Sequence, residues 1–243
     1  MKGSKDEAHK FLAKFEKSLK SLPSAPEMEG WVRQTTRANK APHGDRHLRG
    51  PEAAFLNGHV IPALFNAIRA EGLSDSEARR ALLNENHPSL PQYSVDSPAR
   101  TVRHPFTKAV GASPVEIYKR WADPKDTKAL VQSCPDFALR APFAHSIVFE
   151  GKYFRQGSPE LGRRELVRDT YQAFFYRGLP RVDETKRGRA AWEYEYAVLL
   201  AYDASPQGTL RAAWNALPAK VRNGFWEGAN LYVMILGGTG REA

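Results

Sequence analysis

Cysteine is nearly absent from this sequence: Cys134 is the single one among 243 residues. One thiol cannot form a disulfide within the chain, and it excludes a zinc site built from several cysteines. Such cysteine usage is typical of a reducing compartment, so we expect the cytoplasm as the location.

Long apolar runs are missing as well. No stretch approaches the roughly 20 consecutive apolar residues that a membrane-spanning helix requires, and residues 1–20 combine lysines with no apolar segment. The N-terminus therefore resembles neither a signal peptide nor a membrane anchor, and we expect no membrane association. The P-loop pattern Gly-x-x-x-x-Gly-Lys-Ser/Thr is also absent, so no ATPase or helicase motor is indicated.

The chain has, instead, an excess of positive charge. Its 36 Lys and Arg residues exceed its 27 Asp and Glu residues, which gives a formal net charge of +9 and a pI near 9.6. Basic side chains bind nucleic-acid phosphates by releasing condensed counterions, so a polyanionic partner is the natural interpretation. Solubility alone is the alternative.

The sequence changes character near residue 110. Residues 1–110 are basic and mainly helical in pattern, and we expect a region that could recognise nucleic acid. Residues 111–243 alternate strands with helices. This alternation predicts an α/β fold with a mixed central sheet flanked by helices.

Several helices are predicted in the N-terminal region, over 5–21, over 52–70 with a kink at Pro62, and from a Ser74 N-cap to residue 84. The last two form either a helical hairpin or a DNA-reading helix-turn-helix. The basic run between 32 and 50 is either a phosphate-binding loop or a solvated one. Its candidate DNA-binding residues are Arg37, Lys40, Arg46 and Arg49.

In the second part, periodicity predicts strands over 136–140, 145–154, 194–203 and 231–236. Helices are expected over 113–121, 124–133, 159–177 and 206–226.

The segment that bears on chemistry is Pro135-Asp136, followed by Glu150-Gly151-Lys152. Side chains alternate along a strand, so Glu150 and Lys152 share one face of it. Two charges in a strand apolar enough to be buried are costly unless they have partners or a task.

These residue types suit phosphodiester hydrolysis. Mg²⁺ binds through one or two carboxylates and keeps several waters. Asp136 and Glu150 can supply those carboxylates if their strands are adjacent, with the Gly151 carbonyl as a further ligand. The ion lowers the pKa of a bound water, and Lys152 can steady that water or the developing negative charge.

An acid-x-Lys triplet is weak on its own, because the chain has three more, beginning at Asp123, Asp126 and Glu184. Only Glu150 ends an apolar strand with a Pro-Asp one hairpin upstream. The alternative is a salt bridge of Lys152 with Glu150 or Asp136 that has no catalytic role.

Pro135, Asp136, Glu150 and Lys152 together resemble the PD-(D/E)XK nuclease superfamily, which includes most type II restriction endonucleases. The resemblance covers roughly residues 113–205, in the order helix, strand, strand, helix, strand. It implies a restriction-endonuclease-like fold and dependence on Mg²⁺. It also implies that Asp136 and Glu150 are metal ligands and that Lys152 is the catalytic lysine.

The helix after the catalytic strand adds Gln172 and Tyr176. Gln-x-x-x-Tyr here is similar to a motif of the exonuclease branch of that superfamily, in which it lines the site, so Gln172 is a further catalytic candidate. Arg164 and Arg168 continue the row at four-residue steps, and with Tyr176 they suit phosphate contact. A plain polar helix face is the alternative.

Two further residues stay open at this point. Glu116 could join the site, or simply complement a helix dipole, and His145 could contact a phosphate or be structural.

The sequence thus predicts a Mg²⁺-dependent endonuclease that cleaves double-stranded DNA, most like a type II restriction enzyme. We expect a homodimer, because cutting two strands with one site per chain calls for two chains. One alternative is a repair or recombination exonuclease or a structure-specific nuclease. Another is a non-catalytic DNA-binding protein on the same fold.

Overall fold

The structure, a computed structural model, describes residues 3–19, 51–84, 93–94, 132–133, 136–155, 157–178 and 194–238, together with Leu22, Ser24 and Glu27. The basic run around Arg37, Lys40, Arg46 and Arg49 lies outside these residues. So do Pro135, Glu116 and the boundary near residue 110, which therefore remain predictions.

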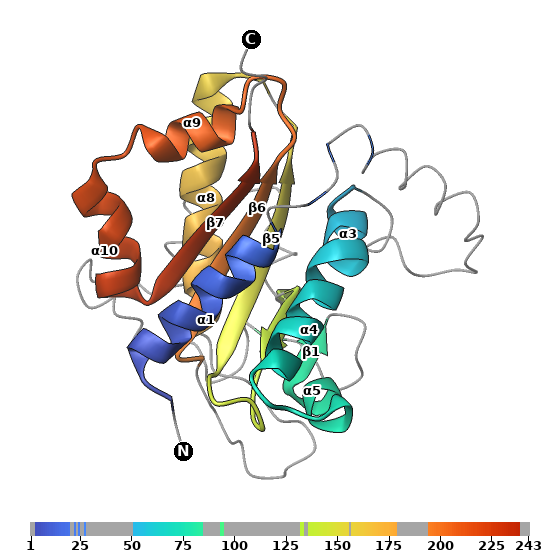
Figure 1. Cartoon of the computed structure of the whole chain (residues 1–243). Coiled ribbons are helices and arrows are strands. Elements are labelled where there is room, and N and C mark those ends of the chain that lie inside the picture. The colour runs from blue at the N-terminus through green and yellow to red at the C-terminus, as the bar shows by residue number, and fades with distance from the viewer. Residues whose placement is uncertain are drawn as a thin grey trace.

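A five-stranded sheet in the order β1-β4-β5-β6-β7 forms the centre of the molecule (Figure 1). β1, β4 and β5 pair antiparallel, whereas β5, β6 and β7 pair parallel. The strands are β1 (Leu82–Asn84), β4 (Phe137–Leu139), β5 (Ile147–Phe154), β6 (Tyr196–Asp203) and β7 (Leu231–Gly237). The predicted α/β class with a mixed sheet between helices is confirmed.

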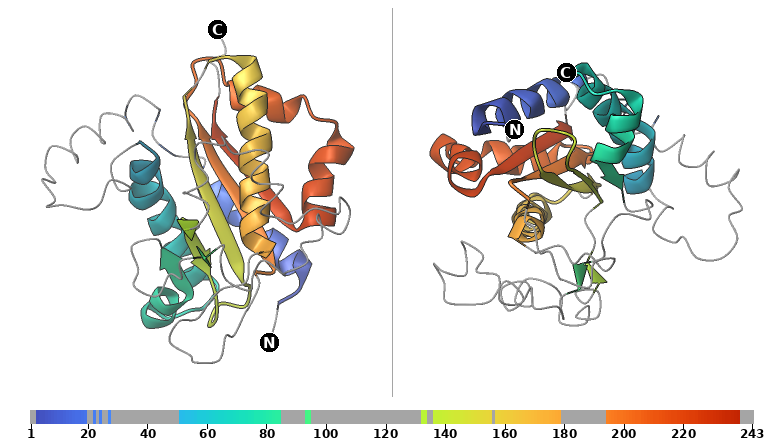
Figure 2. Two further views of the ribbon diagram at one scale, coloured as in Figure 1. Left: turned by 180° about the vertical axis from the view of Figure 1, so that it is seen from behind. Right: turned by 90° about the horizontal axis from the view of Figure 1, so that it is seen from below.

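Helices cover both faces of this sheet, and the view from below in Figure 2 shows the layers. One face carries α8 (Pro159–Gly178), which connects β5 to β6. The other carries α1 (Lys5–Ser18), α3 (Pro51–Phe55), η3 (Leu56–Val60), α4 (Ile61–Ala70) and α5 (Asp75–Ala81). Beside β7 lie α9 (Thr209–Asn215) and α10 (Ala219–Ala229). None of the described helices is long and apolar enough to cross a bilayer.

Successive side chains of β5 point alternately into two hydrophobic cores, one on each face of the sheet. Ile147 and Phe149 join the core under α1, where Phe15 meets Phe149 edge to face. Val148 joins the core under α8 with Ala173. On this side β5 also carries Glu150 and Lys152, as the alternation predicts.

Two predicted helix ends are wrong. The helix behind the confirmed Ser74 capping box stops at Ala81, and residues 82–84 form β1. They pair with β4, so that Leu82 lies opposite Leu139. Residues 132–133, predicted as helical, form β3, which pairs with β2 (Tyr93–Ser94). In both places a strand distant in sequence decides the local structure, which periodicity cannot show.

A π-helical turn replaces the simple kink predicted at Pro62. Residues at four-residue steps face the sheet here, from Glu52 through Leu56, Val60 and Leu64 to Ile68. In an α-helix at about 100° per residue, each such step would turn the row by roughly 40° and carry it off the sheet. A π-turn has more residues per turn and rotates the row back, so Glu52 still faces β5.

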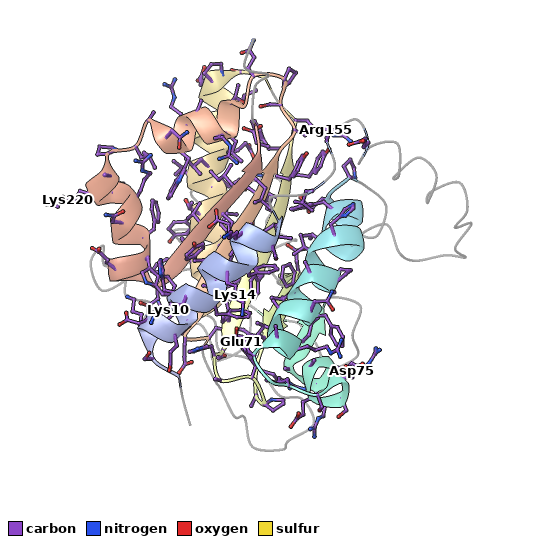
Figure 3. The ribbon with its side chains drawn as sticks, in the orientation of Figure 1. Lys10, Lys14, Glu71, Asp75, Arg155 and Lys220 are labelled. Carbon is purple, nitrogen blue, oxygen red and sulfur yellow. The ribbon has the colours of Figure 1, made fainter. Side chains whose placement is uncertain are left out.

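Ionic contacts link the helices of this layer. Lys14 Nζ on α1 donates to Glu71 Oε1, just after α4, at 3.0 Å (Figure 3). Both side chains are well exposed, so the pair contributes little to stability. The buried apolar row is what fixes the layer on the sheet.

Gly151 provides a test of this packing. A Cβ on Gly151 would lie 2.7 Å from Cδ1 of Leu56 and closer still to its Cδ2. Because Leu56 is buried, we expect Gly151→Ala to lower the free energy of unfolding by about 1–3 kcal/mol in urea titrations.

Gly157→Ala is the matched control, since a Cβ there meets nothing within 4 Å. It should be neutral or slightly stabilising. Adding Leu56→Ala to Gly151→Ala should relieve the overlap. Equal effects of the two glycine variants would refute this packing.

Candidate functional site

Glu150 and Lys152 form an ion pair beneath α8. Lys152 Nζ lies 2.6 Å from Glu150 Oε1. Glu150 is 3% exposed and the Lys152 side chain 18%. Such burial costs several kcal/mol per ion before their attraction offsets it, so a pair of this kind requires further polar partners.

Two further carboxylates lie near this pair, along one edge of β5. β4 begins opposite Phe149, and the backbone groups of Gly151 and Tyr153 point to the same side farther along, because amide direction alternates in a strand. Gly151 N–H donates to Asp136 Oδ2 at 2.6 Å, and Tyr153 N–H donates to Glu52 Oε2 at 3.3 Å. Two acidic side chains thus accept hydrogen bonds from β5 backbone amides that a longer β4 would otherwise pair with.

The Gly151 carbonyl lies on this same edge, because both backbone polar groups of a strand residue point to one side. The structure therefore brings Asp136, Glu150, Gly151 and Lys152 together from the start of β4 and the middle of β5. This is the grouping that the sequence predicts.

The charges of this site are unbalanced. Burial raises the pKa of the Glu150 carboxyl, Lys152 lowers it, and the negative charges of Asp136 and Glu52 raise it again, so that it stands well above its usual value. Burial lowers the pKa of Lys152, but four carboxylates outweigh this effect and raise it well above its usual value. They are Glu150, Glu52, Asp136 and Asp169. Carboxyl groups thus outnumber the single ammonium group in this part of the structure.

The donor set fits a hard divalent cation. Within the described part of the chain, no three His, Cys, Asp or Glu side chains are gathered as a metal-binding group. Mg²⁺, however, needs only one or two carboxylates, because it keeps several waters. Asp136 and Glu150 are oxygen donors of this type, and the excess negative charge favours a cation.

Two acidic residues of this site escaped the sequence analysis. Glu52 is in the first turn of α3, where an acidic residue is common for dipole reasons and gives no signal of a site. Asp169 gave a signal that could have been used: it falls on the buried side of α8, between Leu166 and Ala173. An acidic residue in an apolar row is unusual.

The four predicted residues of α8, Arg164, Arg168, Gln172 and Tyr176, differ in their burial and in their partners. Gln172 Nε2 donates to Tyr176 Oη at 3.2 Å, and Tyr176 is buried in the core under α8. Arg164 is exposed. Arg168 forms ion pairs with Glu165 and Asp169, so part of its charge is already neutralised.

His145 lies apart from this group. It is buried between Phe143 and Tyr196, with both rings edge-on to it, before β5 begins. Burial lowers its pKa, and the surrounding carboxylates offset this only partly. These contacts place His145 with the core under α1, away from the face that carries Lys152.

Asp169 predicts a pH dependence of stability. Burial raises its pKa to about 6, and the nearby Arg168 and Lys152 charges lower it only in part. Since the folded pKa exceeds the unfolded value, stability from this proton is complete below pH 4 and is lost as pH rises through 6.

Between pH 4 and 7, the wild type should lose roughly 2–3 kcal/mol of unfolding free energy relative to Asp169→Asn. Urea titrations of both proteins across this range measure the difference. A difference that does not change with pH would show that Asp169 does not titrate there.

Comparison with known proteins adds no assignment to this geometry. No protein-family model matches the chain, and no match was found among curated proteins or among solved structures. The arrangement of the residues themselves is therefore the basis for a functional proposal.

Proposed function

We propose that this protein is a Mg²⁺-dependent nuclease that hydrolyses phosphodiester bonds in double-stranded DNA. The observation that carries the proposal is the meeting of Asp136, Glu150 and Lys152 where the start of β4 lies beside the middle of β5, with carboxylates in excess. That is the residue set of the PD-(D/E)XK superfamily. The order β4, β5, α8, β6 also agrees with the core that this resemblance implies, and a restriction-endonuclease-like fold belongs to the proposal.

Each residue has a distinct task in this proposal. Asp136 and Glu150 would hold the cation, with the Gly151 carbonyl as a further ligand. The bound cation would polarise the phosphate and lower the pKa of the attacking water. Lys152 donates hydrogen bonds to the negative charge that develops on the phosphate, and its burial strengthens that interaction.

We favour a type II restriction endonuclease that acts as a homodimer in the cytoplasm. The basic charge of the chain suits a DNA partner, and one site per chain suits a dimer that cuts both strands. We assign phosphate contacts to Arg37, Lys40, Arg46 and Arg49 and, on α8, to the exposed Arg164 and Arg168, whereas Tyr176 is buried in the core under α8.

A specific contact favours a second candidate, a repair or recombination nuclease. The hydrogen bond between Gln172 and Tyr176 joins the two residues of the motif typical of the exonuclease branch. A third candidate, a DNA-binding protein without catalysis, is favoured by the closed Glu150–Lys152 ion pair. Incubation with plasmid DNA and Mg²⁺ distinguishes the three candidates. Discrete bands indicate a restriction endonuclease, a progressive smear indicates an exonuclease, and binding without cleavage indicates a non-catalytic protein.

Two substitutions test the site directly. With Mg²⁺ and plasmid DNA, Lys152→Ala should lower the cleavage rate by about 10²–10³-fold, the effect of removing one donor to a developing charge. Asp136→Asn should reduce it at least as far, because it removes a metal ligand. Both should retain DNA affinity in gel-shift assays.

Asp75→Asn is the matched control, because Asp75 lies exposed on α5, outside the site (Figure 3). It should cleave at the wild-type rate. Full activity of either site variant would rule out this assignment, and cleavage that persists in EDTA would rule out the metal.

A further inference from the structure

Asp169 is a buried charge that the proposed nuclease site does not use. It lies within α8 and is 3% exposed. An ionised carboxylate in such a place is costly unless it has a partner or a task. Arg168, its neighbour, is one partner, but its contacts leave the carboxylate only partly satisfied.

The packing of α8 places Asp169 over the centre of β5. Leu166 on α8 shares a hydrophobic cluster with Phe154, at the end of β5. Ala173, two turns farther along α8, shares a cluster with Val148, near the start of β5. Asp169 is buried between these two points, so it faces the stretch of β5 that lies between them.

Glu150 and Lys152 are the side chains that this stretch of β5 turns toward α8. The electrostatics agree with this placement, because the Asp169 charge raises the pKa of Lys152 and Lys152 in turn lowers that of Asp169. Asp169 therefore lies on the helix that covers this stretch of β5, opposite Glu150 and Lys152.

Both groups have unused hydrogen-bonding capacity. Arg168 Nε and Nη2 both reach Asp169 Oδ1, each at 3.0 Å, and among the described residues nothing donates to Oδ2. Lys152 has three N–H donors, and Glu150 Oε1 is its one acceptor within the described residues. A partly buried ammonium on β5 and a buried carboxylate on α8 thus each have a hydrogen-bonding position to fill.

We propose that Asp169 is a positioning residue: it is the second acceptor of the Lys152 ammonium and holds it whenever Glu150 is withdrawn. Its consequence for catalysis rests on the proposed nuclease function. If Glu150 serves as a metal ligand, its oxygens are no longer fully available to Lys152. Asp169 then holds the ammonium in place beside the phosphate.

A double-mutant cycle between Asp169→Asn and Lys152→Met tests the contact without any catalysis. Urea unfolding gives the coupling between the two residues in the wild type and in a Glu150→Gln background. We expect weak coupling in the wild type, where Glu150 occupies Lys152. In the Glu150→Gln background the coupling should rise about tenfold in the unfolding equilibrium constant, within the range for interacting neighbours.

Glu165→Gln is the matched control in this cycle. Glu165 lies one turn before Asp169 on α8 and also pairs with Arg168, but it is not among the carboxylates that chiefly raise the pKa of Lys152. Its coupling to Lys152 should stay near zero in both backgrounds. Should Glu150→Gln fail to fold, Glu150→Asp retracts the carboxylate and serves in its place. Equal coupling of Asp169 and Lys152 in both backgrounds overturns the proposal.

Steady-state cleavage of DNA provides the second readout. In the full-length enzyme with Mg²⁺, Asp169→Asn should lower kcat by about tenfold or more and leave KM for DNA unchanged, since an interaction that acts in the transition state is lost. Glu165→Gln should change neither constant. An Asp169→Asn enzyme with wild-type kcat overturns the proposal.

The two proposals can fail separately. A coupling that rises in the Glu150→Gln background, in a protein that cleaves no DNA, supports the Asp169 contact and removes the nuclease function. Mg²⁺-dependent cleavage with unchanged coupling keeps the nuclease function and removes the role of Asp169.

Discussion

The burial of Glu150 and Lys152 within a strand covered on both faces is the constraint on which the rest of this structure depends. β5 pairs with β6 along its whole length, so its register is set by backbone hydrogen bonds. A slip of one residue would turn both charges into the aromatic core under α1. The strand therefore places two charged side chains where removing them from water costs free energy. The groups around them must offset this cost with hydrogen bonds and opposite charge.

Acidic side chains lie along one edge of β5 and accept hydrogen bonds from its backbone where β4 no longer pairs with it. Asp136 accepts from the Gly151 amide and Glu52 from the Tyr153 amide, at points beyond the start of β4. Glu52 reaches this edge because the π-turn η3 rotates its helix back toward the sheet. Gly151 allows the same helix to approach, since Leu56 occupies the space of the missing side chain. The π-turn η3 thus affects both the packing of Leu56 against Gly151 and the position of the Glu52 carboxylate.

The charge distribution of the site stands in contrast to that of the chain. The sequence carries a net charge of +9, yet the buried site around Lys152 has more carboxylates than cations. Net positive charge attracts a polyanion, whereas a cluster of carboxylates repels it unless a cation mediates. This contrast is the physical reason for preferring metal-assisted phosphodiester chemistry to a purely structural ion pair.

Periodicity in the sequence was sufficient to predict β4 to β7, α8 and the shared face of Glu150 and Lys152, because side-chain alternation is a local property of the backbone. The pairing of Asp136 with this strand also followed from one short hairpin. Only the tertiary structure decided that residues 82–84 join the sheet, that Glu52 accepts from the Tyr153 amide and that Asp169 on α8 is buried. These depend on which distant segment packs opposite, and neither spacing nor composition encodes the direction from which a helix approaches a strand.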